Sequence, residues 1–565
     1  MDTLLTSRSV AASSRFFLIL IVGVFVLHSL WLSYPNEDVH ITFRFARHLA
    51  EGHGIVWNIS EPPIEGYTNF LWMLMTALAI WLGLDVVTTT QIASMLAAVG
   101  TILVSYLLAA RFICKTSLGA LVAPVLLAAS GPMAAWGGSG MEMTAYGFVV
   151  ILSVYAHLNH LARPSFGWIA SSGFLLFIAT LLRPEGVMIF LAISGLAVTV
   201  FFGETRSTLR HQAVWILSFA VPLAIYVAWR LNTFPDLLPN TFYQKTGGGL
   251  WQHIRGFGYV VYFAFFFLIP LIPIPFLLAW ESGWSSLRAP WSVQRIQSLI
   301  ADNRGVIVCA GLASAYFAYN VYAGGDYMPM YRFMVPAIPF IYLLLGPMAE
   351  RLYSLIADVP NKRALSLVVA AIAVGGTFIH STPIEKSFFR KATWQLGNYQ
   401  GIERDREYVA RFELIGRFFA EYDHEPGASL ATRSIGLIGF YAKDLDIHDL
   451  SGLTDRHIAH VQVKSTPQGW AGHEKWDLDY SFHRKPTFFM LDENFAQEDI
   501  AGIASATELA DAIERHYPAS RYADWIRDNP DFIEANYRVR TVWLEDERNG
   551  DSGYFAFLER IPAGS

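Results

Sequence analysis

Residues 16–32 read FFLILIVGVFVLHSLWL, an apolar run that follows Arg8 and Arg15 and gives way to Tyr34-Pro35-Asn36-Glu37. A secretory signal peptide begins in a similar way, but no small-residue cleavage site follows this run. Its length is within the range of a membrane-spanning helix. Because the residues before it are basic, we predict a first membrane helix with its amino end in the cytoplasm.

The charged residues divide the chain into two unlike parts at His380. The whole chain is 53% hydrophobic and 16% charged, whereas a soluble protein averages roughly 25% charged residues. The first 380 residues hold 20 basic and 16 acidic side chains, and the last 185 hold 21 and 31. We therefore predict a membrane domain over residues 1–380 and a water-soluble domain over residues 381–565. Neither part has a dense basic surface, so we expect no nucleic acid partner.

Ten further apolar runs reach spanning length, at 88–110, 118–136, 142–160, 166–182, 186–202, 213–231, 258–280, 305–322, 333–349 and 364–380. The run at 67–84 decides the topology, because a crossing there would invert every later loop. If it lies along the outer surface or re-enters, the basic loops all become cytoplasmic, as the positive-inside rule requires. Those loops contain Arg111, Lys115, Arg163, Arg206, Arg210, Arg288, Arg295, Arg304, Arg351, Lys362 and Arg363. We predict eleven crossings and an external carboxyl-terminal domain.

The same topology places the polar, helix-breaking loops outside, at 35–66, 137–141, 183–186, 232–250 and 323–332. A site assembled from these loops would face the periplasm or the cell exterior. The tail mixes predicted helices at 402–422 and 508–517 with predicted strands at 428–432, 487–491, 538–544 and 554–559, which indicates a small α/β domain. Both cysteines, Cys114 and Cys309, precede the tail, so it contains no internal disulfide.

The first outer loop carries adjacent carboxylates, Glu37 and Asp38, before a segment in which Ile41, Phe45 and Leu49 repeat at helical spacing. The pattern is typical of an amphipathic helix lying at the membrane interface, with Arg44 on another face. The carboxylates could simply cap this helix. A carboxylate just outside the membrane is also where a general base would act on a lipid-linked substrate.

Three other outer segments carry polar groups at the membrane boundary. Tyr67 and Asn69 lie at the start of an apolar run. They could anchor the chain at the membrane interface, or they could cover a binding site for a lipid phosphate. Ionisable groups at membrane depth are costly unless they are paired or functional. Glu142 is such an ionisable group at the start of one predicted membrane helix. Arg183 and Glu185 lie between two other predicted helices, where they could pair with each other.

Two proline-containing outer loops each end in a cation. Residues 232–245 end in Lys245, and residues 324–333 include Asp326 and end beside Arg332. An arginine at this position could extend along the lipid to reach water. It could equally bind a phosphate, because a guanidinium matches phosphate oxygens bidentately.

Eight segments occur in an order that resembles the membrane-embedded GT-C-type glycosyltransferases. They are similar in particular to the terminal β-1,2-arabinofuranosyltransferases of mycobacterial and corynebacterial cell walls and their proteobacterial relatives. Each segment is a weak signal alone, and the resemblance runs from Glu37 to about Lys475. The segments are EDVHITFRFARHLAEGHGIVWN (37–58), EGYTNFLW (65–72), GSGMEMTAY (138–146), LLRPEG (181–186), FPDLLPNTFYQK (234–245), GGDYMPMYRFMVP (324–336), DLSGLTDRHIAH (449–460) and GHEK (472–475).

The resemblance implies a polytopic α-helical GT-C fold with about eleven transmembrane helices, juxtamembrane helices and a C-terminal periplasmic α/β domain. It implies an enzyme of the bacterial inner membrane that transfers a sugar, with inversion, from a polyprenyl-phosphate donor. Arabinofuranose is the expected sugar, and a cell-surface polysaccharide or glycoprotein the expected acceptor, with the tail contributing to acceptor binding. The lipid bilayer is the expected surrounding of residues 1–380.

The resemblance also assigns roles to residues. The related first loop usually reads Asp-Asp, so Asp38 is the expected catalytic base, and Glu37 supports it or helps to bind a divalent cation, Mg²⁺ or Mn²⁺. Metal use varies among related folds, and the sequence does not decide it. The expected donor-phosphate ligands are Arg332, Lys245, Arg44 and Tyr331. The expected substrate-binding residues are Glu142, Arg183, Glu185, Tyr67, Asn69, Asn240, Asp326 and His473.

Three other functions remain open at the level of sequence. The first is a transferase for another lipid-linked sugar, such as mannose or aminoarabinose. The second is a transporter of a polyprenyl-linked sugar, which typically shows an internal two-fold repeat; no such repeat is visible. The third is a membrane-anchored binding protein whose tail carries the function.

Overall fold

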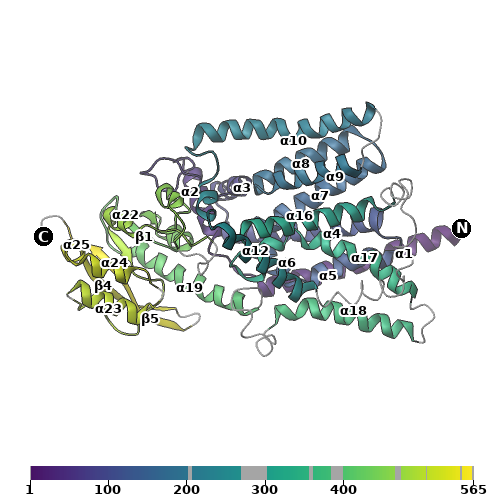
Figure 1. Ribbon diagram of the computed structural model, residues 1–565. Helices are drawn as coiled ribbons and strands as arrows, with labels where there is room; N and C mark the ends of the chain where they lie inside the picture. Colours follow the sequence, from purple (N-terminus) through teal and green to yellow (C-terminus); the bar gives the residue numbers. More distant parts are fainter. Residues whose placement is uncertain are drawn as a thin grey trace.

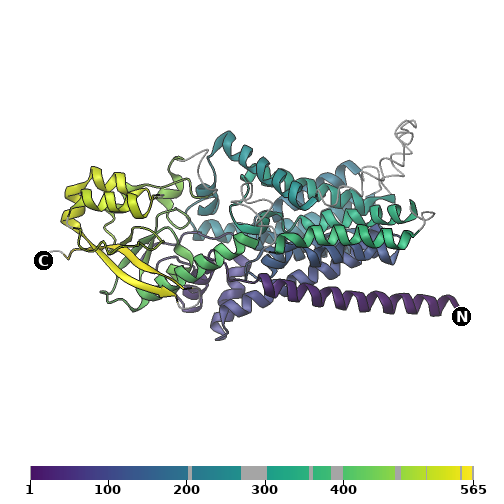
Figure 2. The same cartoon turned by 90° about the horizontal axis from the view of Figure 1, so that it is seen from below.

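The computed structural model describes residues 2–200, 206–268, 302–355, 361–382, 399–464, 472–503, 505–518, 520–546 and 550–562. The protein is mostly helical, with a long helical body and a smaller carboxyl-terminal domain that contains a sheet (Figure 1). The amino end of α1 lies at the opposite end of the molecule from the sheet domain, as Figure 2 also shows.

The described part of the body contains α1 (Asp2–Leu32), α2 (Val39–Ala50), α3 (Phe70–Trp81), α4 (Val86–Leu108), η1 (Ala109–Ile113), α5 (Ser117–Ala129), α6 (Gly131–Gly137), α7 (Met143–Ala162), α8 (Phe166–Leu182), α9 (Gly186–Val200), α10 (Arg206–Thr233), α11 (Asn240–Lys245), α12 (Gly249–Phe263), η2 (Ala264–Leu268), α16 (Arg304–Ala323), η4 (Pro329–Met334), α17 (Ile338–Leu355), α18 (Lys362–Phe378) and η6 (Ile379–Ser381). Long apolar helices of this kind bury their backbone polar groups internally, which is what a bilayer requires.

Several of these helices make the protein a multi-pass membrane protein. Among the residues that the structure describes, five helices are long and apolar enough to cross a bilayer, or six if the bent pair α5–α6 counts as one span. The five are Ser14–Leu32, Val86–Ile113, Met143–Ala162, Leu209–Thr233 and Arg304–Ala323. Eleven crossings therefore stay a prediction, and of the expected span 258–280 only the part up to Leu268 is described. Arg288 and Arg295 lie outside the described residues.

The predicted span at 118–136 is not one straight helix, because α5 and α6 meet at an angle of 62°. The two helices together are long and apolar enough for one bent span, so this crossing stays a prediction. Ser130 separates them and accepts a hydrogen bond from the Met133 N–H at 3.5 Å. Pro132 lies in the first turn of α6. A proline is well suited to the first turn of a helix, but it cannot supply the N–H that a continuous helix needs.

The α3 helix agrees with the interpretation that residues 67–84 do not cross. It has 12 residues, which corresponds to a length of about 18 Å at 1.5 Å per residue. The hydrocarbon core of a bilayer is about 30 Å thick. An α3 that crossed would leave a large part of this thickness to irregular backbone, which lipid does not tolerate.

The carboxyl-terminal domain is an α/β fold, as predicted. It contains α19 (Tyr399–Glu421), β1 (Ser429–Thr432), α20 (Ile435–Tyr441), β2 (Asp446–Asp449), α21 (Arg456–His460), α22 (Leu478–His483), β3 (Phe488–Met490), α23 (Ala506–His516), α24 (Tyr522–Asp528), α25 (Pro530–Asn536), β4 (Tyr537–Asp546) and β5 (Asp551–Arg560). The strand order is β2-β1-β3-β5-β4, with β1 parallel to β2 and β3, and with β5 antiparallel to β3 and β4.

Alternate residues of the strands pack on opposite faces of the sheet. Phe488 and Phe557 pack on the α19 side, whereas Phe489 and Leu558 belong to the core under α23 and α24. This is the two-residue period of a strand covered on both faces. The four predicted strands correspond to β1, β3, β4 and β5. The β2 strand was not predicted, because three of its four residues, Asp446, His448 and Asp449, are polar and it lacks an apolar run.

The segment 39–57, which begins with α2, shares a hydrophobic core with the carboxyl-terminal domain. Phe45 of α2 and Trp57 lie in the same buried cluster as Leu430 of β1 and Ile438 of α20. The expectation that α2 is a helix was correct, but its polar face is covered by α20 rather than by water or lipid headgroups. The two domains therefore meet around the segment that carries Glu37 and Asp38.

Candidate active site

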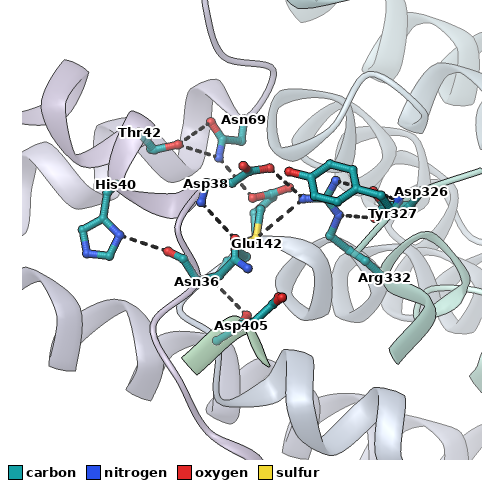
Figure 3. Close-up of polar contacts among 12 residues, drawn as sticks. Asn36, Asp38, His40, Thr42, Asn69, Glu142, Asp326, Tyr327, Arg332 and Asp405 are labelled. Carbon is teal, nitrogen blue, oxygen red and sulfur yellow. Dashed lines mark hydrogen bonds and ion pairs between the residues drawn. The ribbon is translucent and has the colours of Figure 1, made fainter. Parts of the chain in front are cut away.

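Asp38 lies where segments from distant parts of the chain converge, close to Arg332, Glu142 and Asn69 (Figure 3). It directly precedes α2 but makes no capping hydrogen bond to that helix. Instead, its Oδ2 accepts a hydrogen bond from Nη1 of Arg332 at 3.1 Å. The side chain of Asp38 is 20% exposed. The capping interpretation is therefore wrong for Asp38, whose carboxylate remains accessible beside a cation.

Arg332 is fixed by a second carboxylate. Its Nε and Nη2 donate to Oδ2 and Oδ1 of Asp326 at 2.6 and 3.0 Å. The two residues before it, Met330 and Tyr331, have positive φ angles of 56° and 46°. This uncommon backbone conformation turns the chain sharply at the start of the segment. The Arg332 side chain is only 4% exposed, so the structure does not support a lipid-extended arginine.

A second polar network lies beside the first. Arg183 Nη1 donates to Glu142 at 2.6 Å, and Arg183 Nη2 donates to Glu185 at 2.6 Å. The hydroxyl of Tyr319, on α16, also donates to Glu185 at 2.7 Å. Asn69 Nδ2 donates to the other Glu142 oxygen at 3.1 Å. The pairing expected for Arg183 and Glu185 is present, and the network extends to Glu142 and Asn69, which precede α7 and α3, and to Tyr319 of α16.

Two cavities adjoin at these networks. The larger has a volume of about 330 Å³ and extends between α11, α12 and α16. The smaller, of about 80 Å³, lies against Asp38, Asn69 and Glu142. They share six lining residues, Thr68, Arg183, Thr241, Lys245, Arg332 and Phe333. A molecule in the larger cavity could therefore extend a group into the smaller one, past two arginines and a lysine.

Lys245 lies on the boundary of both cavities, with its side chain exposed to their space. In the described part of the chain its ammonium makes no hydrogen bond or ion pair, in contrast to the paired Arg183 and Arg332. Desolvation inside the cavity, followed by the positive charge of Arg332, lowers the pKa of Lys245. An anion placed here would relieve both effects, so the site is suited to a phosphate.

Arg44 does not reach this site, and the prediction that it binds phosphate is wrong. Its Nε donates to the carbonyl of Trp57 at 3.0 Å, Nη2 to Leu445 at 2.8 Å, and Nη1 to Gly439. The residue is 2% exposed. Its donors are used to join α2 to the carboxyl-terminal domain, because the buried carbonyls there require partners.

Tyr331 and Asn240 also point away from the cavities. The Tyr331 ring packs against Tyr259, Phe263 and Phe267, and the residue lines neither cavity. Asn240 donates to backbone carbonyls of the carboxyl-terminal domain. The roles expected for them in binding the donor or the substrate are therefore not supported by their positions.

Glu37 faces a different partner from Asp38. Its Oε1 accepts a hydrogen bond from the N–H of Gly436 at 2.7 Å, at the beginning of α20, and it lines neither cavity. Burial, together with the negative charge of Asp38, raises the pKa of Glu37 well above its usual range. Through the hydrogen bond from Gly436, Glu37 links the first loop to the carboxyl-terminal domain.

The other predicted substrate-binding residues lie at or near the cavities. Tyr67 lines the smaller cavity, and Asp326 lines the larger one. The ring of His473, from the carboxyl-terminal domain, contacts Tyr327 with 5.0 Å between ring centroids. Burial lowers the pKa of His473 to about 4. Its imidazole is therefore neutral at physiological pH and is suited to hydrogen bonding rather than to charge.

No group of three or more His, Cys, Asp or Glu side chains suited to a metal ion occurs among the described residues. Mg²⁺ takes six oxygen ligands, several of them water. Glu37 and Asp38 lie within hydrogen-bonding reach of each other, so they remain the expected ligands if an ion binds.

Comparisons with known proteins give limited matches. A family model for a domain of unknown function (DUF8728) matches residues 398–557. No curated protein matches the chain. The crystal structure of ArnT from Cupriavidus metallidurans bound to undecaprenyl phosphate is similar, with 14% identity, a TM-score of 0.47, and coverage of 76% of this chain and 85% of that chain. The apo ArnT structure has 15% identity and a TM-score of 0.48, and the match covers 77% of this chain and 86% of that chain. Similarity at this level does not define an activity.

Sequence reasoning missed two residues that line the larger cavity, Arg255 and Tyr319, and one that lies near the site, Asp405. Arg255 lines the larger cavity and pairs with Glu474 at 2.7 Å. A lone arginine preceding an apolar run was a signal that could have identified it. Tyr319 could not be found in this way, because a tyrosine in an apolar helix is ordinary. Asp405 of α19 accepts a hydrogen bond from Tyr34 at 3.3 Å, and only the fold brings it close.

Proposed function

We propose that the protein is an inverting GT-C-type glycosyltransferase that moves a sugar from a polyprenyl-phosphate donor to a cell-envelope acceptor. One observation carries the proposal. The partly exposed carboxylate of Asp38 shares a small cavity with Lys245 and Arg332, and this cavity opens into a larger one. Asp38 and Arg332 are in direct contact at 3.1 Å, so a sugar placed between the base and the phosphate would take the place of this ion pair, with Lys245 and Arg332 turned to the phosphate.

The larger cavity is suited to the lipid end of such a donor. Its apolar lining includes Met188, Leu238, Phe242 and Tyr322. Leu238, Phe242 and Tyr322 remain substantially exposed at its edge. Exposed apolar side chains beside a cavity in a membrane protein are suited to an isoprenoid chain, because neither surface needs water there. The phosphate would then lie at the boundary of the two cavities.

The chemistry follows from this arrangement. The acceptor hydroxyl attacks the anomeric carbon from the face opposite the phosphate, and Asp38 accepts its proton as the new C–O bond forms. The bond from the anomeric carbon to the phosphate oxygen breaks, and its electron pair leaves with the polyprenyl phosphate. Lys245 and Arg332 stabilise the charge that develops on the departing phosphate. Inversion results from a single displacement.

Polar groups in the smaller cavity are placed to orient the sugar. Glu142 and Asn69 line this space with their polar side chains, and Arg183 holds Glu142 in place through a hydrogen bond. We propose arabinofuranose as the sugar, in line with the sequence resemblance. We further propose that this face of the bacterial inner membrane is periplasmic, and that the carboxyl-terminal domain binds the acceptor glycan or glycoprotein.

The decisive experiment combines purified protein with defined donors. The protein in detergent should release polyprenyl phosphate from polyprenyl-phospho-arabinofuranose in the presence of a cell-envelope glycan extract. Mass spectrometry of the glycan from a deletion strain should show the loss of one terminal pentose. Consumption of a mannose or aminoarabinose donor instead would change the sugar but keep the reaction class. Movement of an intact lipid-linked sugar, with no transfer, would contradict the proposal.

A further inference from the structure

The small helix α11 carries Lys245 as its last residue. On its carboxyl side, Gly247 and Gly249 have positive φ angles of 105° and 59°. Glycine adopts this conformation without strain but fixes the backbone poorly. The position of Lys245 therefore depends on what contacts α11 from elsewhere in the chain.

The carboxyl-terminal domain supplies those contacts through the loop after β2. Asn240 Nδ2 donates to the carbonyls of Gly452 and Leu453, each at 2.9 Å. Gln244, the residue before Lys245, donates through Nε2 to the carbonyl of Ser451 at 3.1 Å. Both amide side chains are buried. Buried amide donors of this kind are costly to leave without acceptors, so they fix the orientation of α11.

The accepting loop is itself shaped in advance by Asp449 at the end of β2. Its carboxylate accepts the N–H groups of Ser451, Gly452 and Thr454 at 2.7, 3.0 and 2.6 Å. These bonds turn the loop backbone so that its carbonyls remain available to α11. The loop is therefore a preformed template rather than a segment that α11 has to order.

Lys475 binds the carboxyl end of α11. Its ammonium donates to the carbonyl of Tyr243 at 2.8 Å and to that of Ala459 at 2.9 Å. Tyr243 lies in the last turn of α11, where a cation is favoured by the unpaired carbonyls. Lys475 is 7% exposed, and desolvation lowers its pKa. A buried ammonium with backbone acceptors fixes the chain that provides them.

Gly472 completes the arrangement. A Cβ atom at this position would lie 3.5 Å from both Cγ and Cε of Lys245. The aliphatic stem of Lys245 therefore runs along the bare backbone of Gly472, whose φ is +80°. Gln244 Nε2 also donates to the Gly472 carbonyl. The carboxyl-terminal domain thus contacts both the helix and the side chain that end at the cavity.

We propose that the carboxyl-terminal domain places Lys245 for the donor phosphate, with Gln244 and Lys475 as positioning residues. The inference rests on the proposed function, in which Lys245 contacts that phosphate. Neither positioning residue lines the cavities, so each acts through Lys245. The carboxyl-terminal domain is then a part of the donor site as well as a platform for the acceptor.

The test is a double-mutant cycle on the binding of undecaprenyl phosphate by the purified full-length protein in detergent, followed by tryptophan fluorescence. Lys245→Met and Lys475→Met should each weaken binding about tenfold, the effect of losing one charged contact. The double variant should bind no more weakly than Lys245→Met alone, because the second change acts through the first. Gln244→Met, a neutral change of similar size, should show the same dependence.

Arg456→Gln is the matched control, since it breaks an exposed pair with Asp236 in the same interface and should leave binding unchanged. Additive losses in the double variant would overturn the inference, as would wild-type binding in both Lys475→Met and Gln244→Met. If Lys475→Met lowers the melting temperature strongly, its weaker binding could reflect unfolding. The double-mutant cycle of Gln244→Met with Lys245→Met then decides whether the inference holds. Wild-type binding in Lys245→Met would contradict the phosphate role itself, which separates a failure of the proposed function from a failure of the positioning.

Discussion

Asp38 and Arg332 are 294 positions apart in the chain, yet their side chains form an ion pair at the boundary of the two cavities. The other side of the Arg332 guanidinium is taken by Asp326. Glu37, adjacent to Asp38 in sequence, turns toward α20 instead. Two neighbouring carboxylates that look equivalent in sequence therefore have different surroundings, and their substitution should have different effects.

Asp38→Asn should abolish transfer while leaving the protein folded. The amide keeps the size of the side chain but cannot accept the acceptor proton, and loss of a general base typically costs about 10² to 10⁴ in rate. Turnover with the polyprenyl-phosphate sugar donor measures the effect, and Asp236→Asn, in an exposed pair, serves as the control. A wild-type rate in Asp38→Asn would remove Asp38 from the mechanism.

Glu37→Gln should keep most of the activity. Burial and the charge of Asp38 both disfavour the ionised form of Glu37 and raise its pKa, so a neutral amide is tolerated here, and the glutamine oxygen can still accept the Gly436 N–H. We expect a rate within about threefold of wild type, a difference below roughly 0.7 kcal/mol. A loss as large as that of Asp38→Asn would show that Glu37 acts directly in the reaction.

Asp405 should give the stability of the protein a measurable pH dependence. Burial raises the pKa of Asp405 to about 7, above its usual value near 3.9. The folded state therefore binds more protons than the unfolded state between these values, and stability falls as the pH rises through this window. Tyr34, Arg404, Asp38 and Asp326 are the neighbouring groups that face it.

The Asp405→Asn variant isolates this contribution, because asparagine mimics the neutral acid. The melting temperatures of wild type and variant should be similar near pH 4, and the variant should melt higher at pH 8. Equal differences at both pH values would show that Asp405 does not titrate in this window.

At the level of elements, α2 shows that a polar helix face predicted to be exposed can be buried by packing against another domain. The helical spacing of Ile41, Phe45 and Leu49 predicted the helix correctly. The polar residues on its other faces suggested solvent or headgroups, but Arg44 and His48 are buried. Arg44 supplies hydrogen bonds to carbonyls from both domains. A short amphipathic helix cannot reveal from sequence alone that a distant domain covers its polar face.

Arg44→Met should therefore reduce stability rather than donor binding. It leaves the carbonyls of Trp57, Gly439 and Leu445 without their donor, at a cost of about 3 kcal/mol or more for a buried charged partner. Thermal unfolding in detergent should shift downward, with Arg417→Gln as a control because that arginine is largely exposed. If Arg44→Met instead weakened the binding of polyprenyl phosphate at unchanged stability, Arg44 would have the phosphate-binding role that was expected from the sequence.

On the scale of the whole molecule, the sequence predicted most of the described helices and four of the five described strands, because these depend on local hydrophobic periodicity. It also selected Asp38, Lys245 and Arg332, since charged residues between apolar runs are rare. It could not show that Asp38 pairs with Arg332, nor that Asn240 faces the carboxyl-terminal domain. Those facts depend on contacts between segments hundreds of residues apart, which hydropathy and spacing do not encode.

The predicted topology has a direct test in a variant without Cys114 and Cys309. Lys115 is exposed in the link between η1 and α5, and Lys443 is exposed in the carboxyl-terminal domain. A membrane-impermeant thiol reagent applied to intact cells should label Lys443→Cys and not Lys115→Cys, because basic loops remain in the cytoplasm. The opposite labelling pattern would invert the topology and place the cavities inside the cell.

The ion pair between Asp38 and Arg332 also sets an order of events for the proposed reaction. While Arg332 Nη1 donates a hydrogen bond to Asp38, one oxygen of the carboxylate is occupied by that contact. A donor phosphate that takes over Nη1 frees the carboxylate at the moment when its own bond is to be broken. An acceptor that arrives first meets a base already engaged. Initial-rate kinetics should therefore be sequential and ordered, with the lipid donor binding before the glycan.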